Sequence, residues 1–158
     1  MPATYEPIAT TTTTGSAATV TFSSIPSTYT DLVVVMNFSL SGNNEVLWQF
    51  NSDTGANYSR TYAEGNGSTA SSARGSGSNY IYSLGRTTQM IQLVNINNYS
   101  NTTTYKNTLH RFSSAVEIVG MQVGLWRSTA AISTIGISLS AGTFTNGSVI
   151  SLYGVKAA

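Results

Sequence analysis

The sequence contains no cysteine and few charged residues. Without cysteine, the chain can form neither disulfide bonds nor zinc–thiolate sites, and it offers no thiol nucleophile. Charged residues make up 8% of its 158 positions, against about 25% in an average globular domain. The two lysines, Lys106 and Lys156, and the five arginines are scattered along the chain. We therefore expect no nucleic-acid partner, because a phosphate backbone attracts clustered cations.

Long apolar runs are also missing. No run approaches the roughly 20 residues that span a bilayer, and the N-terminus lacks a basic segment followed by an apolar one. We expect a protein that is neither embedded in a membrane nor secreted through an ordinary signal peptide. Its solubility must come from hydroxyl and amide groups, because Ser and Thr supply 46 of the 158 residues. A hydrophobic content of 41%, with nine tyrosines, nevertheless predicts a packed core rather than disorder.

The apolar residues alternate with polar ones and do not recur at helical spacing. In residues 18–22 (ATVTF) the apolar side chains fall on every second position, which places them on one face of an extended strand. This pattern predicts an all-β fold, a two-sheet antiparallel β-sandwich of jelly-roll-like form. Ten strands are expected, at 18–22, 32–40, 46–50, 57–63, 80–84, 90–96, 105–113, 118–126, 132–139 and 149–155.

The N-terminal segment has few residues that could enter a core. Five consecutive threonines, Thr10 to Thr14, favour extended backbone whose main-chain groups stay free to pair. We predict an extended N-terminal arm at residues 1–16 and a sandwich domain at 17–158. The arm would contact a neighbouring protein through Tyr5, Ile8, Thr11 and Thr13. An ordinary first strand within the sandwich, or a frayed terminus, remains an alternative.

A second weakly apolar segment, residues 64–79 (EGNGSTASSARGSGSN), interrupts the strands. It contains no large apolar residue and cannot be a central strand, so we expect a surface loop. The alternative is a loop that contacts a partner, with Arg74 as its only cation. The two tryptophans differ in context. Trp48 lies inside a predicted strand and is expected in the core, whereas Trp126, beside Arg127 at a strand end, could be exposed at a rim and contact a partner together with Arg127.

Catalytic chemistry would have to come from one histidine, two aspartates and four glutamates. His110 has no carboxylate or nucleophile beside it in the sequence, so we interpret it as a structural or surface residue. Asp53 could meet Glu45 or Glu64 in space as a glycosidase pair, but its surroundings (FNSDTG) are typical of a turn. A calcium loop would need more carboxylates than this segment offers. We therefore expect a non-enzymatic protein with no catalytic residues, no cofactor and no metal site.

Five segments, spread from the first residue to the last, resemble a family of small virion structural proteins of tailed bacteriophages, including cyanophages. These are MPATYEPIA (1–9), SSIPSTYTDL (23–32), FNSDTGANYS (50–59), VGLWRS (123–128) and LYGVKAA (152–158). No single segment is a chemical signature, but their order runs through the whole chain. The resemblance carries no catalytic residues onto this sequence.

The resemblance implies a structural component of the virus particle. Its first implication is a capsid decoration (cement) protein, made in the host cytoplasm and located on the capsid surface of the virion. Its partners would then be the major capsid protein and itself, as a homotrimer suited to the threefold positions of an icosahedral shell. The alternative is a receptor- or glycan-binding head of a tail fibre or other appendage, with a host glycan as partner.

Overall fold

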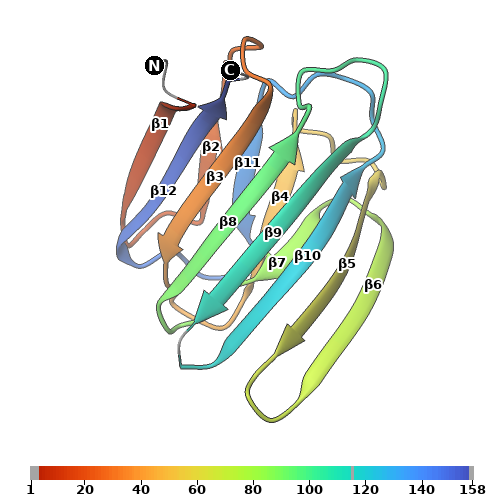
Figure 1. Ribbon diagram of the computed structural model, residues 1–158. Helices are drawn as coiled ribbons and strands as arrows, with labels where there is room; N and C mark the ends of the chain where they lie inside the picture. The colour runs from red at the N-terminus through yellow and green to blue at the C-terminus, as the bar shows by residue number, and fades with distance from the viewer. Residues whose placement is uncertain (1–3, 115, 157–158) are drawn as a thin grey trace.

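A computed structural model describes residues 4–114 and 116–156, and these residues form twelve β-strands and no helix. The strands build two antiparallel sheets packed face to face (Figure 1). The larger sheet has eight strands, in the spatial order β1 (Tyr5–Thr14), β12 (Asn146–Val155), β3 (Asp31–Phe38), β8 (Met90–Asn97), β9 (Lys106–Ser114), β10 (Ile118–Trp126), β5 (Tyr58–Gly65) and β6 (Ala70–Ser78). The smaller sheet has four, in the order β2 (Thr19–Phe22), β11 (Ile135–Leu139), β4 (Glu45–Phe50) and β7 (Ile81–Leu84).

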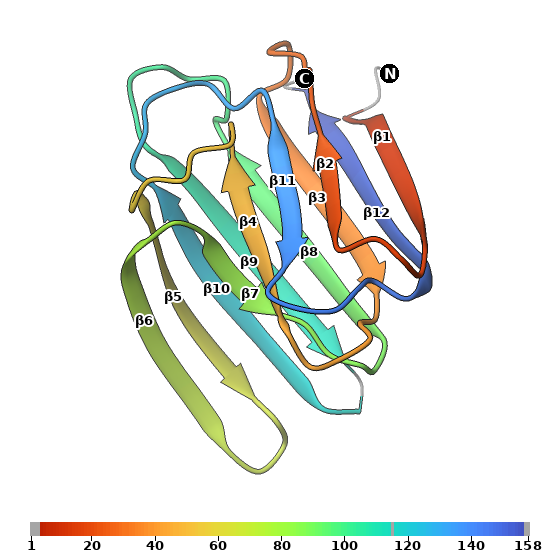
Figure 2. The same cartoon turned by 180° about the vertical axis from the view of Figure 1, so that it is seen from behind.

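The expected all-β sandwich is confirmed, and its strand order is that of a jelly roll with an extension. Strands β1-β12-β3-β8 of the large sheet interleave along the chain with β2-β11-β4-β7 of the small sheet, as in two Greek keys wound together. Strands β9, β10, β5 and β6 continue the large sheet beyond this eight-strand unit. Figure 2 shows the small sheet in front, with the β5–β6 hairpin projecting to one side of it.

The core lies between the two sheets and is built by alternation. On β3, Leu32, Val34, Met36 and Phe38 are buried and point toward the small sheet. Trp48 of β4 is buried opposite them, as its place in a strand predicts. All ten strands expected from alternation are present, with bounds shifted by a few residues.

The predicted N-terminal arm is not separate from the sandwich. Residues 5–14 form β1, an edge strand of the large sheet whose backbone pairs with β12 from Tyr5 opposite Val155 to Thr14 opposite Asn146. Pro7 is tolerated there because an edge strand needs hydrogen bonds on one side only. The backbone is extended as expected, but its partner is the C-terminal strand of the same chain. Residues 1–3 of the expected arm lie outside the described residues.

The predicted loop at 64–79 is likewise wrong in part. Residues Ala70–Ser78 form β6, which pairs with β5 to make a hairpin, and the turn between them is short. The prediction that this segment is not a central strand is confirmed, because β6 is the last strand of the large sheet. An edge strand with both faces in solvent needs no apolar side chains, so alternation cannot reveal it.

Candidate functional site

The outer surface of β8, β9 and β10, which faces away from the small sheet, carries an unusual number of exposed apolar side chains. On β10, Val119, Met121 and Val123 are 63%, 56% and 51% exposed. Neighbouring strands add further apolar positions in register with them. We call this surface the apolar face and define it by Ile91, Leu93, Leu109, Val119, Met121 and Val123.

Two of the inward positions of β10, Gly120 and Gly124, must stay small. An added Cβ on Gly120 would lie 2.8 Å from the carbonyl oxygen of Ala63, and one on Gly124 would lie 2.7 Å from Cδ1 of Ile81. Both distances are shorter than real Cβ contacts. The glycines therefore let β10 pack closely against its neighbours. The large inward side chains, Ile118 and Trp126, lie at the two ends of the strand. Val119, Met121 and Val123 fall on the opposite face.

Cross-strand register turns these residues into a continuous surface. Met121 faces Arg111 on β9, and Arg111 faces Leu93 on β8. The surface is hollowed in two places. One hollow, of about 490 Å³, lies among residues of β5, β8, β9 and β10. The other, of about 320 Å³, extends the surface across β3 to the aromatic rings of Tyr5 and Tyr153. Arg111 and Leu93 line both hollows.

Arg111 is the one charged residue at the outward positions of β8, β9 and β10, all of which the structure describes. Its side chain is exposed, and Nη2 donates a hydrogen bond to Oδ1 of Asn95 at 3.1 Å. A guanidinium carries five N–H donors, so most remain available to a partner. The apolar face therefore has a single cation near its centre, and Glu64 of β5 lines the larger hollow beside it.

The sequence predicted the strands that carry the apolar face, but it did not identify any of the exposed residues on them as a candidate site. A partial signal was present in residues 118–126, IVGMQVGLW, where valine, methionine and leucine alternate with glycine and glutamine. An alternating strand normally turns its apolar set inward. The other set combines two glycines and a glutamine with Ile118 and Trp126 at its ends, so the pattern alone does not indicate which set faces outward.

The four residues predicted to form an N-terminal contact all belong to β1, and their side chains point to different sides of the large sheet. Tyr5 is 57% exposed and lines a hollow of the apolar face. Ile8 packs against the core, and Thr11 is half-buried. Thr13 is buried and donates a hydrogen bond to the carbonyl of Thr145 at 2.6 Å. Tyr5 is thus the one member of this set that reaches the apolar face.

The expectation that Trp126 is exposed at a rim is wrong. The residue is 2% exposed, and its ring stacks on Tyr58 with ring centroids 6.3 Å apart. Its indole Nε1 donates a hydrogen bond to Oδ2 of Asp53 at 2.7 Å. Arg127 is half-buried, and its Nη1 donates to Oγ of Ser59 at 3.1 Å. Arg74 is exposed on β6, and its outward position continues the row of Val123 and Leu109.

Asp53 has the turn role that its sequence context predicts. Oδ1 accepts a hydrogen bond from the Gly55 amide at 2.8 Å, and Oδ2 accepts one from Nδ2 of Asn57 at 2.9 Å. The hydrogen bond from Trp126 is the main cause that lowers the pKa of this carboxyl, so it stays ionised. Both carboxylate oxygens of Asp53 therefore accept hydrogen bonds that stabilise the turn and Trp126. Glu45, its expected partner in a glycosidase pair, forms an ion pair with Arg60 instead.

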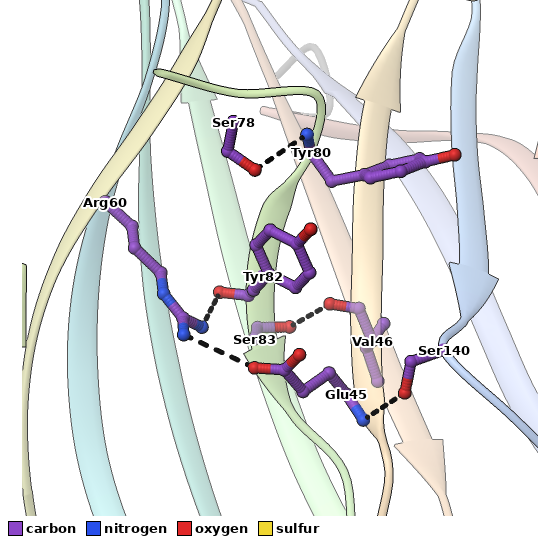
Figure 3. A network of polar contacts seen from close by, with 8 residues as sticks. All are labelled: Glu45, Val46, Arg60, Ser78, Tyr80, Tyr82, Ser83 and Ser140. Atoms are coloured by element: carbon purple, nitrogen blue, oxygen red, sulfur yellow. Dashed lines mark hydrogen bonds and ion pairs between the residues drawn. The ribbon is translucent and has the colours of Figure 1, made fainter. Parts of the chain in front are cut away.

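Glu45 belongs to a polar cluster that fixes the projecting hairpin to the small sheet (Figure 3). Arg60 of β5 reaches across the gap: Nη1 donates to the carbonyl oxygen of Tyr82 at 2.7 Å, and Nη2 lies 3.3 Å from Oε1 of Glu45. The guanidinium also lies over the rings of Tyr62 and Tyr82. This arrangement makes Arg60 a structural clamp for strand β5.

His110 is structural, as expected. It is fully buried between the sheets, where Nδ1 lies 3.3 Å from Nε2 of Gln92 and Nε2 lies 2.9 Å from Oγ1 of Thr108. Its ring meets Trp48 edge to face, with centroids 5.3 Å apart. Burial lowers the pKa of His110 from 6.5 to about 3, so the ring is neutral at physiological pH. It cannot exchange protons with a solvent-exposed substrate.

Within residues 4–114 and 116–156, no three His, Asp or Glu side chains are grouped so that they could hold a metal ion. The same residues contain no helix long and apolar enough to cross a bilayer. A scan against protein-family models finds no match to this chain, and a search of curated proteins finds none either.

Proposed function

We propose that the protein is a capsid decoration protein of a tailed bacteriophage, which attaches to the major capsid protein through its apolar face and stabilises the shell. The single observation that carries the proposal is the apolar face itself, with Val119, Met121 and Val123 more than half exposed. Contiguous exposed apolar surface of this kind marks interaction sites in soluble proteins. The sequence resemblance supplies the viral context.

The size of the surface suits a protein interface. Three strands about 4.8 Å apart, with about five residues each at 3.4 Å, give a flat apolar centre of roughly 250 Å². A standard interface buries about 800 Å² on each partner, with an apolar core inside a polar rim. Strands β1 and β6 of the large sheet, rich in Thr and Ser respectively, would supply part of the rim.

Charge favours a different protein over a second copy on this face. Two copies packed face to face would bring the cation at the centre of each face, Arg111, close to its counterpart with no acidic residue at the outward positions of β8, β9 and β10 to separate them. A capsid protein that presents a carboxylate within an apolar patch would instead pair with Arg111. The proposed homotrimer would then form through other surfaces of the sandwich.

Binding to capsids assembled without this protein tests the proposal. The wild-type protein is expected to co-sediment with such capsids in hundreds of copies and to raise the temperature at which they break. Met121→Asp and Val123→Asp are each expected to weaken binding at least about tenfold, because each buries a charge in an apolar interface.

The control is Ala73→Asp, which adds the same charge at an exposed position on β6 whose side chain points to the other side of the large sheet from the apolar face. It should bind like the wild type. All three substitutions lie on the surface, so the free energy of unfolding should change by less than about 0.5 kcal/mol. Undiminished capsid binding by both apolar-face variants would refute the proposal, as would a particle reconstruction that places about a dozen copies on the tail.

A further inference from the structure

The outer surface of the small sheet, on the opposite side of the sandwich from the apolar face, contains a polar groove of about 340 Å³. Two cross-strand rows form it. Thr21, Gly136 and Gln49 lie side by side on β2, β11 and β4, and the row below contains Thr19 and Ser138. Tyr80, the residue immediately before β7, also lines the groove. In Figure 3 its side chain extends from β7 in the direction of β4 and β11.

Gly136 forms the floor of this groove, and the fold gives no reason for a glycine there. It is the one glycine in the strands of the small sheet, all of which are described. Its φ angle is not in the left-handed region, and an added Cβ would meet nothing closer than 3.7 Å. Gly120 and Gly124, in contrast, are required by close packing. A glycine inside a strand weakens it, and such a residue often marks a place where a ligand approaches the backbone.

The groove's lining specifies the chemistry of a ligand. Hydroxyl groups of Thr19, Thr21 and Ser138 can donate and accept hydrogen bonds, and the ring of Tyr80 offers an apolar face. No Asp, Glu, Lys or Arg is among the described residues that line the groove. A charged ligand would therefore find no counter-ion in it.

Gln49 adds an unused donor. Its amide Nε2 is buried and has no hydrogen-bond partner among the described residues. The terminal torsion of a glutamine side chain is soft, so the amide can turn toward the groove. A buried amide without a partner costs free energy, and a ligand hydroxyl that accepts its hydrogen bond would remove that cost.

We propose that this groove binds a neutral saccharide, with one sugar ring stacked on Tyr80 and resting over Gly136. Sugar hydroxyls accept from the Gln49 amide and exchange hydrogen bonds with the threonine and serine hydroxyls. The volume of about 340 Å³ is at the lower end of small-molecule sites. A short glycan segment is therefore the expected ligand. This site is separate from the apolar face, so a decoration protein attached to a shell would present it outward.

The test is a titration of the ¹⁵N-labelled protein, followed by NMR, with three neutral probes: maltotriose, cellotriose and N-acetylchitotriose. At least one probe is expected to shift the Gln49 side-chain amide and the Gly136 backbone amide in a saturable manner. Sialyllactose, which is acidic, should bind no more tightly than its neutral counterpart, lactose. Tighter binding of sialyllactose than of lactose would overturn the proposal that the ligand is neutral. If no probe shifts the resonances of the groove residues, the proposal that the groove binds a saccharide is overturned.

Variants separate binding from folding. Gly136→Ala fills the groove floor and is expected to weaken saccharide binding about tenfold, as one misplaced methyl group does in a fitted pocket. Tyr80→Ala, which removes the stacking surface, should weaken it roughly tenfold as well. The matched control is Gly75→Ala on β6, where an added Cβ would also meet nothing closer than 4.0 Å. Unchanged affinity in both groove variants would overturn the proposal, and so would an equal loss in the control.

Discussion

Burial of His110 predicts that the protein loses stability on mild acidification. The ring accepts a hydrogen bond at Nδ1 from the Gln92 amide and donates one from Nε2–H to Thr108. Protonation of Nδ1 would place its N–H opposite the N–H of the Gln92 amide, so two hydrogen-bond donors would face each other. The groups around the ring, Gln92, Thr108 and Trp48, are uncharged and offer no counter-ion. The native state therefore keeps the ring neutral, with a pKa lowered from 6.5 to about 3.

The sign and size of the effect follow from linkage. A pKa below the unfolded value means that the unfolded chain binds a proton that the native chain rejects, so stability falls as pH drops below 6.5. Each pH unit in this range is worth about 1.36 kcal/mol. At pH 5 the free energy of unfolding should thus be about 2 kcal/mol lower than at pH 7.5. The carboxyls of Glu6 and Asp53 also have lowered pKa values, but their contribution is lost only below about pH 4.

Urea unfolding at pH 7.5, 6 and 5 measures this difference. A His110→Gln variant, which cannot be protonated there, should have the same stability at all three values, whatever its absolute stability. The ring protons of His110 in the wild type should show no NMR titration down to pH 4. Equal wild-type stability at pH 7.5 and pH 5, or a ring that titrates near pH 6.5, would refute the reasoning.

Two further substitutions test the packing. Gly154→Ala should destabilise the fold by about 1–3 kcal/mol, because the added Cβ would overlap the ring of Tyr29. The control is Gly136→Ala, which has room for its Cβ, and thermal unfolding of both variants measures the difference. Equal destabilisation by the two substitutions would contradict this prediction. Trp126→Phe should lower the free energy of unfolding by about 1.5–3 kcal/mol, because it removes a hydrogen bond to the ionised Asp53. A loss below about 0.5 kcal/mol in urea unfolding would show that this bond contributes little.

Local sequence patterns were sufficient for the elements that bury one face. Alternation located ten of the twelve strands, because a half-buried strand must place an apolar side chain at every second position. The turn role of Asp53 followed from its neighbours, since side-chain capping of a turn is a local interaction. The core position of Trp48 followed in the same way.

Elements whose role depends on distant partners could not be predicted in this way. The threonine-rich segment is a strand of the sandwich because β12, more than 130 residues later, lies beside it. Trp126 is buried because Tyr58 and Asp53, which lie about 70 residues earlier in the chain, contact its ring in the folded protein. Strand β6 has no apolar pattern at all, and only its pairing with β5 makes it a strand.

The candidate surfaces also depend on tertiary structure. Period-two alternation by itself determined which residues of β10 share a side, but it does not specify which side meets the other sheet. In the folded protein, Trp126 packs in the core and the neighbouring strands lie close to Gly120 and Gly124, so Val119, Met121 and Val123 face solvent. Likewise, Gly136 lies in a groove only because β2 and β4 pair on either side of β11. The sequence alone determined the extended backbone and the composition of each strand. Only the long-range pairing of strands decided which side chains share a surface.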